Sequence, residues 1–159
     1  MIGDAYENHR TLVAAEAAQS HRELFSRFGE QYPAKLRQLI EYGQTVGPGR
    51  LEEIQSHRER TKVALDEALG EWDVVISPSA PGAAPRGIEA TGDPRMNLIW
   101  TYAGLPTLTL PAALDDQGLP VGVQLTGARM QDAALMAAGV VVESALGFAA
   151  QPQQRSDES

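Results

Sequence analysis

The chain has 159 residues, 43% of them hydrophobic and 21% charged, so it is long enough to form one soluble domain with a real core. A formal net charge of -8, with an isoelectric point near 4.8, argues against nucleic acid or an anionic membrane as the main partner. The absence of cysteine excludes disulfides, thiolate catalysis and cysteine metal sites, and it is compatible with a cytoplasmic location.

The N-terminus is not expected to be a signal peptide, and the C-terminus is expected to be a polar tail. The first ten residues, MIGDAYENHR, are acidic and polar, unlike a signal peptide. No apolar run approaches the roughly 18 residues that a membrane helix needs. The polar residues 149–159 are expected to form a disordered tail.

The first half of the sequence predicts helices, because apolar residues recur there at helical spacing between glycine and proline breaks. The expected helices cover residues 5–28, 34–42 and 50–69. The expected helix ends are Gly29, Gly43 and Gly70, and Gly47-Pro48-Gly49 is expected to break the chain. The three histidines, His9, His21 and His57, are expected on exposed helix faces.

The second half of the sequence predicts strands. Val74-Val75-Ile76 is a short β-branched run that predicts a buried strand, and a long loop over residues 79–93 follows it. Pro94 is expected to begin a short helix that ends near Tyr102. The segments LPTLTLPAAL and LPVGVQLTG predict two strands separated by the turn Asp115-Asp116-Gln117-Gly118.

The last predicted element is a helix from Asp132 to Leu146, ended by Gly147, and it is apolar on all sides. The expected fold class is therefore α/β, in the sense of an α+β fragment. N-terminal helices precede a small mixed sheet, and one helix covers that sheet. Three strands make a thin sheet, so the chain is expected to be short of partners for its own apolar surface.

Serines at the end of the first strand are the obvious candidates for a nucleophile. Ser77 and Ser79 lie where the apolar run meets a loop rich in Pro, Gly and Ala. A serine hydroxyl needs a His or Lys within hydrogen-bonding reach to take its proton. The only lysines are Lys35 and Lys62, and no strained G-x-S-x-G turn surrounds either serine. We therefore predict no catalytic residue in this chain.

No cofactor or metal site is predicted either. The histidines lack the spacing of metal ligands, and the sequence has no Walker loop and no dinucleotide-binding glycine pattern. Arg95 and Arg129 could meet a polar group of a substrate, although exposed loop arginines are commoner. A strand end followed by a loop of small residues is typical of a ligand pocket in α/β proteins, so a pocket without a catalyst is the interpretation from residues alone.

Four blocks of the sequence resemble the C-terminal third of the amidase signature family, and the likeness extends over nearly the whole chain up to Phe148. The pairing of a GLP segment with GLPVGVQ is its most specific part. The blocks are DVVISPSAPGAAP (73–85), ATG (90–92), NLIWTYAGLPTLTLPAAL (97–114) and GLPVGVQLTGARMQDAALMAAGVVVE (118–143).

The resemblance implies the fold and chemistry of an amidase. Members of that family cleave amides, or use the released ammonia in amidotransfer, with a serine nucleophile, a second serine in a cis peptide and a lysine. Their Gly/Ser-rich catalytic block has no counterpart here. The resemblance therefore implies that residues 1–148 are the C-terminal portion of an amidase-type C–N hydrolase, inactive alone. Whether the chain is itself an enzyme stays open.

The resemblance also implies which residues line the substrate pocket. The positions matching Thr91, Pro94 and Leu98 face the acyl side of the substrate, and the position matching Met130 approaches the same pocket, where Met gives an adaptable apolar wall. Leu98 and Met130 could equally be core residues. Ser77 and Ser79 are interpreted as wall. The small-molecule amide would bind once the missing N-terminal segment completes the site.

Two other functions stay open at this point. The chain could be a binding or assembly module that hides its strand edge and apolar helix in a homodimer. It could also be part of an amidotransferase A-type subunit that uses an aminoacyl-tRNA as its substrate, which the acidic composition does not support. The sequence does not identify the amide.

Overall fold

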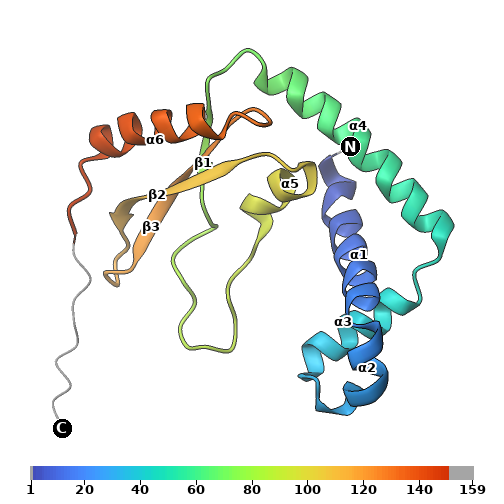
Figure 1. Cartoon of the computed structure of the whole chain (residues 1–159). Coiled ribbons are helices and arrows are strands. Elements are labelled where there is room, and N and C mark those ends of the chain that lie inside the picture. The colour runs from blue at the N-terminus through green and yellow to red at the C-terminus, as the bar shows by residue number, and fades with distance from the viewer. Residues whose placement is uncertain (1, 151–159) are drawn as a thin grey trace, which may run out of the picture.

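The computed structural model describes residues 2–150, and the remainder of the predicted tail, residues 151–159, lies outside them (Figure 1). Helices α1 (Ile2–Ser20), α2 (Arg22–Phe28), η1 (Gly29–Gln31), α3 (Ala34–Gln44) and α4 (Pro48–Leu69) form the first half. The second half contains β1 (Val75–Pro78), α5 (Arg95–Ala103), β2 (Thr107–Leu114), β3 (Pro120–Thr126) and α6 (Asp132–Leu146). The predicted order of helices followed by a small covered sheet is confirmed.

The sheet has the strand order β1-β3-β2, and β3 runs antiparallel to both neighbours. The sheet is therefore antiparallel throughout, not mixed as the sequence predicted. The turn after β2 folds β3 back along it as a hairpin. β1 then pairs with the free side of β3, Ser77 opposite Gln124, so the first strand runs parallel to β2 without contacting it.

Helices cover the two faces of the sheet unequally (Figure 1). Leu108, Leu110 and Leu125 point to one face and pack with Leu135 of α6. The other face carries Gln124, and α5, which lies between the sheet and α1, packs only against its β1 and β3 part. α5 therefore joins the sheet to the helical half. Thr107 and Thr109 of β2 lie on the same face and are exposed.

Three helix boundaries differ from the prediction. The predicted helix over residues 5–28 is interrupted at His21, whose ring Nδ1 lies 2.9 Å from the hydroxyl of Tyr32. Gly43 does not end α3 but lies inside it, buried where α3 approaches α1 closely. The predicted break at Gly47-Pro48-Gly49 falls slightly earlier, over residues 45–47, and Pro48 already occupies the first turn of α4, where its missing N–H is tolerated.

The first strand is not buried as predicted. Ile76 of β1 is 57% exposed, and the burial of the strand alternates between half-buried and exposed residues. The reason is its position: β1 forms one edge of the sheet and has a neighbour only on the β3 side. An apolar β-branched strand at an uncovered edge is a site at which another chain can pair.

Helix α6 buries one stripe and exposes the rest. Leu135 and Gly139 are buried against the sheet, with Val142 and Leu146 half-buried beside them. The remaining apolar residues of the helix face away, and Met136, Val140 and Val141 are the large exposed ones. The expectation that this chain lacks partners for its own apolar surface is thus supported by the exposed face of α6.

The histidines are not solvated as expected, because each lies against a tyrosine. His9 and His57 flank Tyr102, with ring centroids 6.1 and 5.8 Å away, and His21 contacts Tyr32 at 5.5 Å. Tyr102 is 1% exposed and its hydroxyl donates to the Ile54 carbonyl, 3.1 Å away. The Tyr102 hydroxyl has one proton, and the bond to Ile54 takes it. Nδ1 of His57, 3.0 Å from the Tyr102 hydroxyl oxygen, is therefore the donor in that second hydrogen bond.

This cluster predicts a loss of stability in mild acid. Burial, and secondarily the charge of Arg58, lowers the pKa of His9 below its ordinary value of 6.5. As the pH drops through 6.5, His9 is protonated in the unfolded chain before it is protonated in the folded chain. The free energy of unfolding therefore falls between pH 6.5 and the lower folded-state pKa of His9. We expect His9→Gln to flatten this dependence in urea midpoints measured between pH 7.5 and 5. An unchanged slope in the variant would contradict this assignment.

None of the helices in the described residues is both long and apolar enough to cross a membrane.

Candidate functional site

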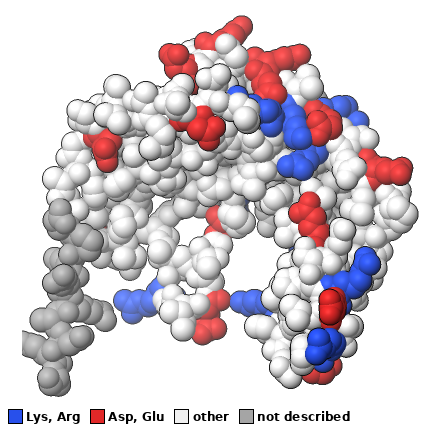
Figure 2. All heavy atoms as spheres, in the orientation of Figure 1, with Lys and Arg blue, Asp and Glu red and all other residues white. Residues whose placement is uncertain are grey.

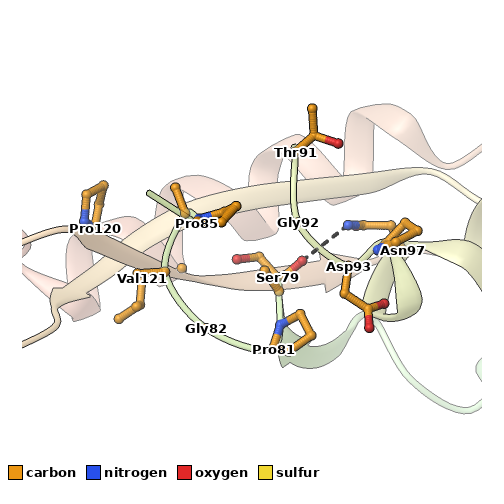
Figure 3. A pocket seen from close by; sticks show the side chains of 15 residues that line it. Ser79, Pro81, Gly82, Pro85, Thr91, Gly92, Asp93, Asn97, Pro120 and Val121 are labelled. Carbon is orange, nitrogen blue, oxygen red and sulfur yellow. Dashed lines mark hydrogen bonds between the residues drawn. The ribbon is translucent and has the colours of Figure 1, made fainter. Parts of the chain in front are cut away.

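A hollow of about 570 Å³ lies between the loop after β1, the start of α5 and the start of β3 (Figure 3). Small side chains form most of its wall, as the sequence of the loop predicted. The lining residues are Ser79, Ala80, Pro81, Gly82, Ala83, Ala84, Pro85, Thr91, Gly92, Asp93, Pro94, Asn97, Pro120, Val121 and Gly122. The hollow is open to solvent, and its lining comes from the loop, the start of α5 and β3. Figure 2 shows a separate opening between this loop and the helical half.

The rim of the hollow is fixed where α5 begins. The carboxylate of Asp93 accepts hydrogen bonds from the backbone N–H of Arg95 at 2.9 Å and from its side-chain Nε at 2.7 Å. These hydrogen bonds, chiefly the side-chain one, lower the pKa of Asp93. Asp93 thus satisfies a free backbone N–H in the first turn of α5 and keeps its negative charge near that helix terminus.

The floor of the hollow depends on a glycine and an asparagine. Asn97 of α5 donates from Nδ2 to the Ser79 carbonyl at 3.2 Å, which ties the helix to the end of β1 (Figure 3). A Cβ on Gly122 would lie 2.8 Å from Oγ of Ser79 and 2.9 Å from the Leu110 carbonyl oxygen. Only glycine lets the loop after β1 lie this close to β3.

Only two of the four predicted pocket residues line the hollow. Thr91 and Pro94 line the hollow, from its loop and from the residue before α5. Leu98 is half-buried on α5 and is not part of the lining. Met130 lies ahead of α6, 85% exposed, with a left-handed φ of 62°. The structure therefore brings together two of the four.

The hydroxyls of Ser77 and Ser79 have no basic side chain beside them in the described part of the chain. Lys35 donates to the Glu89 carbonyl at 3.1 Å, across to the loop, and Lys62 pairs with Glu59 on α4. The histidines lie against tyrosines. Serine attack on an amide would need a proton acceptor at the hydroxyl. Ser79 is the one of these two serines that lines the hollow, and the carboxylate of Asp93, which also lines it, accepts hydrogen bonds from Arg95.

The two arginines considered as substrate ligands have structural partners. Arg95 pairs with Asp93. Arg129 donates from Nη1 to the Ala103 carbonyl at 2.8 Å and pairs with Asp66 of α4 at 3.3 Å. The carbonyl oxygens at the end of α5 are therefore capped by a cation, which the helix dipole favours. No group of three potential metal ligands occurs among the described residues.

Sequence reasoning missed Asn97 and Gly122 as parts of the site. Both lie inside the blocks that resemble the amidase family, but an asparagine on a helix and a glycine in a strand have many roles. An isolated glycine in a strand pattern does signal a close backbone approach. Nothing in the sequence indicated that its neighbour would be Ser79.

The helical half, the antiparallel hairpin sheet and the loop-walled hollow define an α+β domain portion with a hollow at the end of a strand. The family profile described as Amidase matches residues 4–136. The chain belongs to the amidase family, as the resemblance predicted.

Relatives with known names support this assignment. The chain is 36% identical over 108 aligned positions to the A subunit of glutamyl-tRNA(Gln) amidotransferase from Rhizorhabdus wittichii, covering 62% of this chain and 22% of that protein. It is 40% identical over 93 positions to the corresponding protein of Lachnospira eligens, covering 54% and 19%. The chain thus spans about a fifth of the length of these relatives.

A solved structure matches more of the chain. A crystal structure described as an amidase superposes with a TM-score of 0.83 at 28% identity, covering 92% of this chain and 36% of that one. A structure described as fatty acid amide hydrolase superposes with a TM-score of 0.74 at 19% identity, covering 92% and 32%, which shows the fold alone. In both, the matched region is about a third of the protein.

Proposed function

We propose that this chain is the C-terminal portion of an amidase-type C–N hydrolase, which supplies part of the substrate-pocket wall and is inactive alone. The observation that carries the proposal is the family match over residues 4–136, combined with lysines and histidines that all have partners away from Ser77 and Ser79. Amide hydrolysis needs an activated nucleophile, and this portion provides the shape of a site without one.

The surface left uncovered is where the rest of such a domain would pack. Figure 2 shows the charged side chains gathered mainly over the helical half, whereas the surface over α6 and the sheet is mostly uncharged. The exposed side chains there include Ile76, Met136, Val140 and Val141. Large exposed apolar side chains on a mostly uncharged surface are typical of an interaction site. The matched amidase is nearly three times longer than its matched region, so it contains the additional chain that could cover such a surface.

The pocket residues have proposed roles in this completed site. Thr91 and Pro94 would face the acyl part of the amide, from the wall they already form. Leu98 and Met130 would join that wall only when the complementary polypeptide packs against them; the exposure of Met130 leaves it free for such a contact. The amide would be a small molecule. The cytoplasmic location and the lack of a nucleic-acid or membrane partner stay predictions.

Two alternatives each have one favouring observation. The exposed apolar face of α6 also suits a homodimer, in which the chain acts as an assembly module. The similarity to amidotransferase proteins favours a role in such an enzyme. The first alternative predicts a dilution-resistant dimer by size-exclusion chromatography with light scattering. The second predicts glutaminase activity on completion, where the main proposal predicts hydrolysis of simple amides.

Complementation tests the main proposal. The partner is the upstream part of the structurally matched amidase, truncated before the segment that this chain matches and coexpressed with it. We expect no turnover of aliphatic or aryl amides by either polypeptide alone, and measurable turnover by the pair. Turnover by this chain alone that disappears in Ser77→Ala or Ser79→Ala would overturn the proposal, because it would require a base within this chain.

A further inference from the structure

Three polar side chains lie together on the face of the sheet that α5 covers. Ser77 of β1 is directly opposite Gln124 of β3, and Thr126 follows Gln124 by two positions, so all three point to the same side. Gln124 and Thr126 are completely buried, with 0% of their surface exposed. Buried positions between a sheet and a helix are normally apolar, and these three are not.

Three oxygens in this group have no hydrogen-bond partner within the described residues. They are Oγ of Ser77, Oε1 of Gln124 and Oγ1 of Thr126. The orientation of the Gln124 amide is fixed, because its Nε2 donates to the Met96 carbonyl of α5 at 3.3 Å, and only the nitrogen can donate. Its oxygen is therefore the atom of the amide that is left without a partner. A buried oxygen without a partner costs free energy that a native structure normally avoids.

The group is continuous with the hollow. Ser79 lies two residues beyond Ser77, and Gly122 lies two residues before Gln124, and both line the hollow. The alternation of a strand places residues two apart on one face, so polar groups run from the floor of the hollow to beneath α5. A molecule that hydrogen-bonds to these buried oxygens must be very small, and it must be able both to donate and to accept hydrogen bonds.

We propose that Ser77, Gln124 and Thr126 form an internal water site between the sheet and α5, filled from the hollow. A buried water usually makes about three hydrogen bonds to otherwise unpaired groups, and the site offers three such oxygens. The water donates to Oε1 of Gln124 and exchanges hydrogen bonds with the two hydroxyls. Gln124 in turn holds α5 through Met96, so the site positions the helix whose first turns wall the hollow.

This hydrated site does not depend on any catalytic role of the chain. Removing the Thr126 hydroxyl while keeping its shape tests the site directly. We expect Thr126→Val to lower the thermal midpoint by about 2–4 °C, because a hydrogen bond to the water is lost and a further group is left short of a partner.

Thr107→Val is the matched control, because Thr107 is directly opposite Thr126 on β2 and is exposed. The control should leave the midpoint within about 1 °C of the wild type, since Thr107 is exposed and its hydroxyl is not one of the buried oxygens without a partner. A higher midpoint for Thr126→Val would overturn the proposal, because it would mean that the hydroxyl has no partner to lose. Equal midpoints for the two variants would overturn it as well.

A measurement on the unaltered chain separates water from a rearranged side chain. In a high-resolution crystal structure, we expect density for a water within hydrogen-bonding distance of both Oε1 of Gln124 and Oγ of Ser77. Magnetisation transfer from water to the Gln124 side-chain amide gives the same information in solution. A direct hydrogen bond from Ser77 to Gln124, with no water density between the strand and α5, would refute the site.

Discussion

Replacing Gly43 by alanine is expected to lower the free energy of unfolding by about 3 kcal/mol. The new Cβ would lie 1.9 Å from the Ala14 carbonyl oxygen and 2.4 Å from its carbon, both of them backbone atoms of α1. No rotamer change relieves such a contact, so α1 and α3 must move apart. Alanine is the better helix former by about 1 kcal/mol, which offsets only part of the cost. Urea unfolding monitored by circular dichroism measures the difference.

The chain offers a matched control in Gly49. This glycine also lies in a helix, in the first turn of α4, but a Cβ there would meet nothing within 4 Å. Gly49→Ala should therefore keep or raise stability, by up to about 1 kcal/mol. Equal effects of the two substitutions would show that α1 and α3 are not in close contact.

A charge on the exposed face of α6 is expected to prevent complementation. In the pair described above, Val141→Asp should lower amide turnover by about 100-fold, because an unpaired carboxylate in an apolar interface loses its hydration without compensation. Val141 is 68% exposed in the chain alone, so the variant should keep the thermal midpoint of the isolated chain. The same experiment reports activity and, by co-purification, assembly.

The matching substitution on a charged surface is Val63→Asp. Val63 lies in the middle turns of α4 and is 57% exposed, against 68% for Val141. The two Val→Asp substitutions therefore change helix propensity by a similar amount at similarly exposed positions. It lies outside the apolar surface proposed as the interface, and we expect the pair that carries it to assemble and turn over normally. Wild-type activity with Val141→Asp, or equal losses with both variants, would exclude the outer face of α6 from the interface.

The glycines illustrate which parts of the fold were predictable. Gly70 and Gly147 follow helices, as the sequence indicated, because a residue that suits the end of a helix can be recognised locally. Gly43 satisfied the same local rule and the prediction was wrong. Its role depends on α1, almost thirty residues away in the sequence, and helical spacing carries no information on that distance.

The predictions for the histidines and the first strand failed for the same kind of reason. His9 and His57 were expected to be exposed because they lie in predicted exposed helices and lack the spacing of metal ligands, yet both pack on Tyr102 of α5. Ile76 was expected to be buried because its run is apolar, yet β1 pairs at an edge. Local composition indicates the preference of a segment, and burial is decided by which other segments reach it.

The position of the hollow agrees with the sequence, and its role as a substrate pocket stays a prediction. The sequence indicated that the loop after β1 lines a pocket, and Thr91 and Pro94 do line the hollow. Leu98 and Met130 lie elsewhere in this chain, and their place in a pocket stays a proposal. Asn97 and Gly122 were not foreseen, since each acts through a contact with Ser79 or its carbonyl, which only the folded loop creates.

By itself, the sequence determined the family, the order of helices and strands, and the presence of an apolar helix with too few partners. These properties follow from local patterns and from blocks of residues that are recognisable without coordinates. The tertiary structure alone decided that the sheet is antiparallel with β1 at its edge, that Gly43 joins two helices, and that polar side chains are buried beneath α5. Such features arise from contacts between residues distant in the chain, and they exist only once the chain has folded.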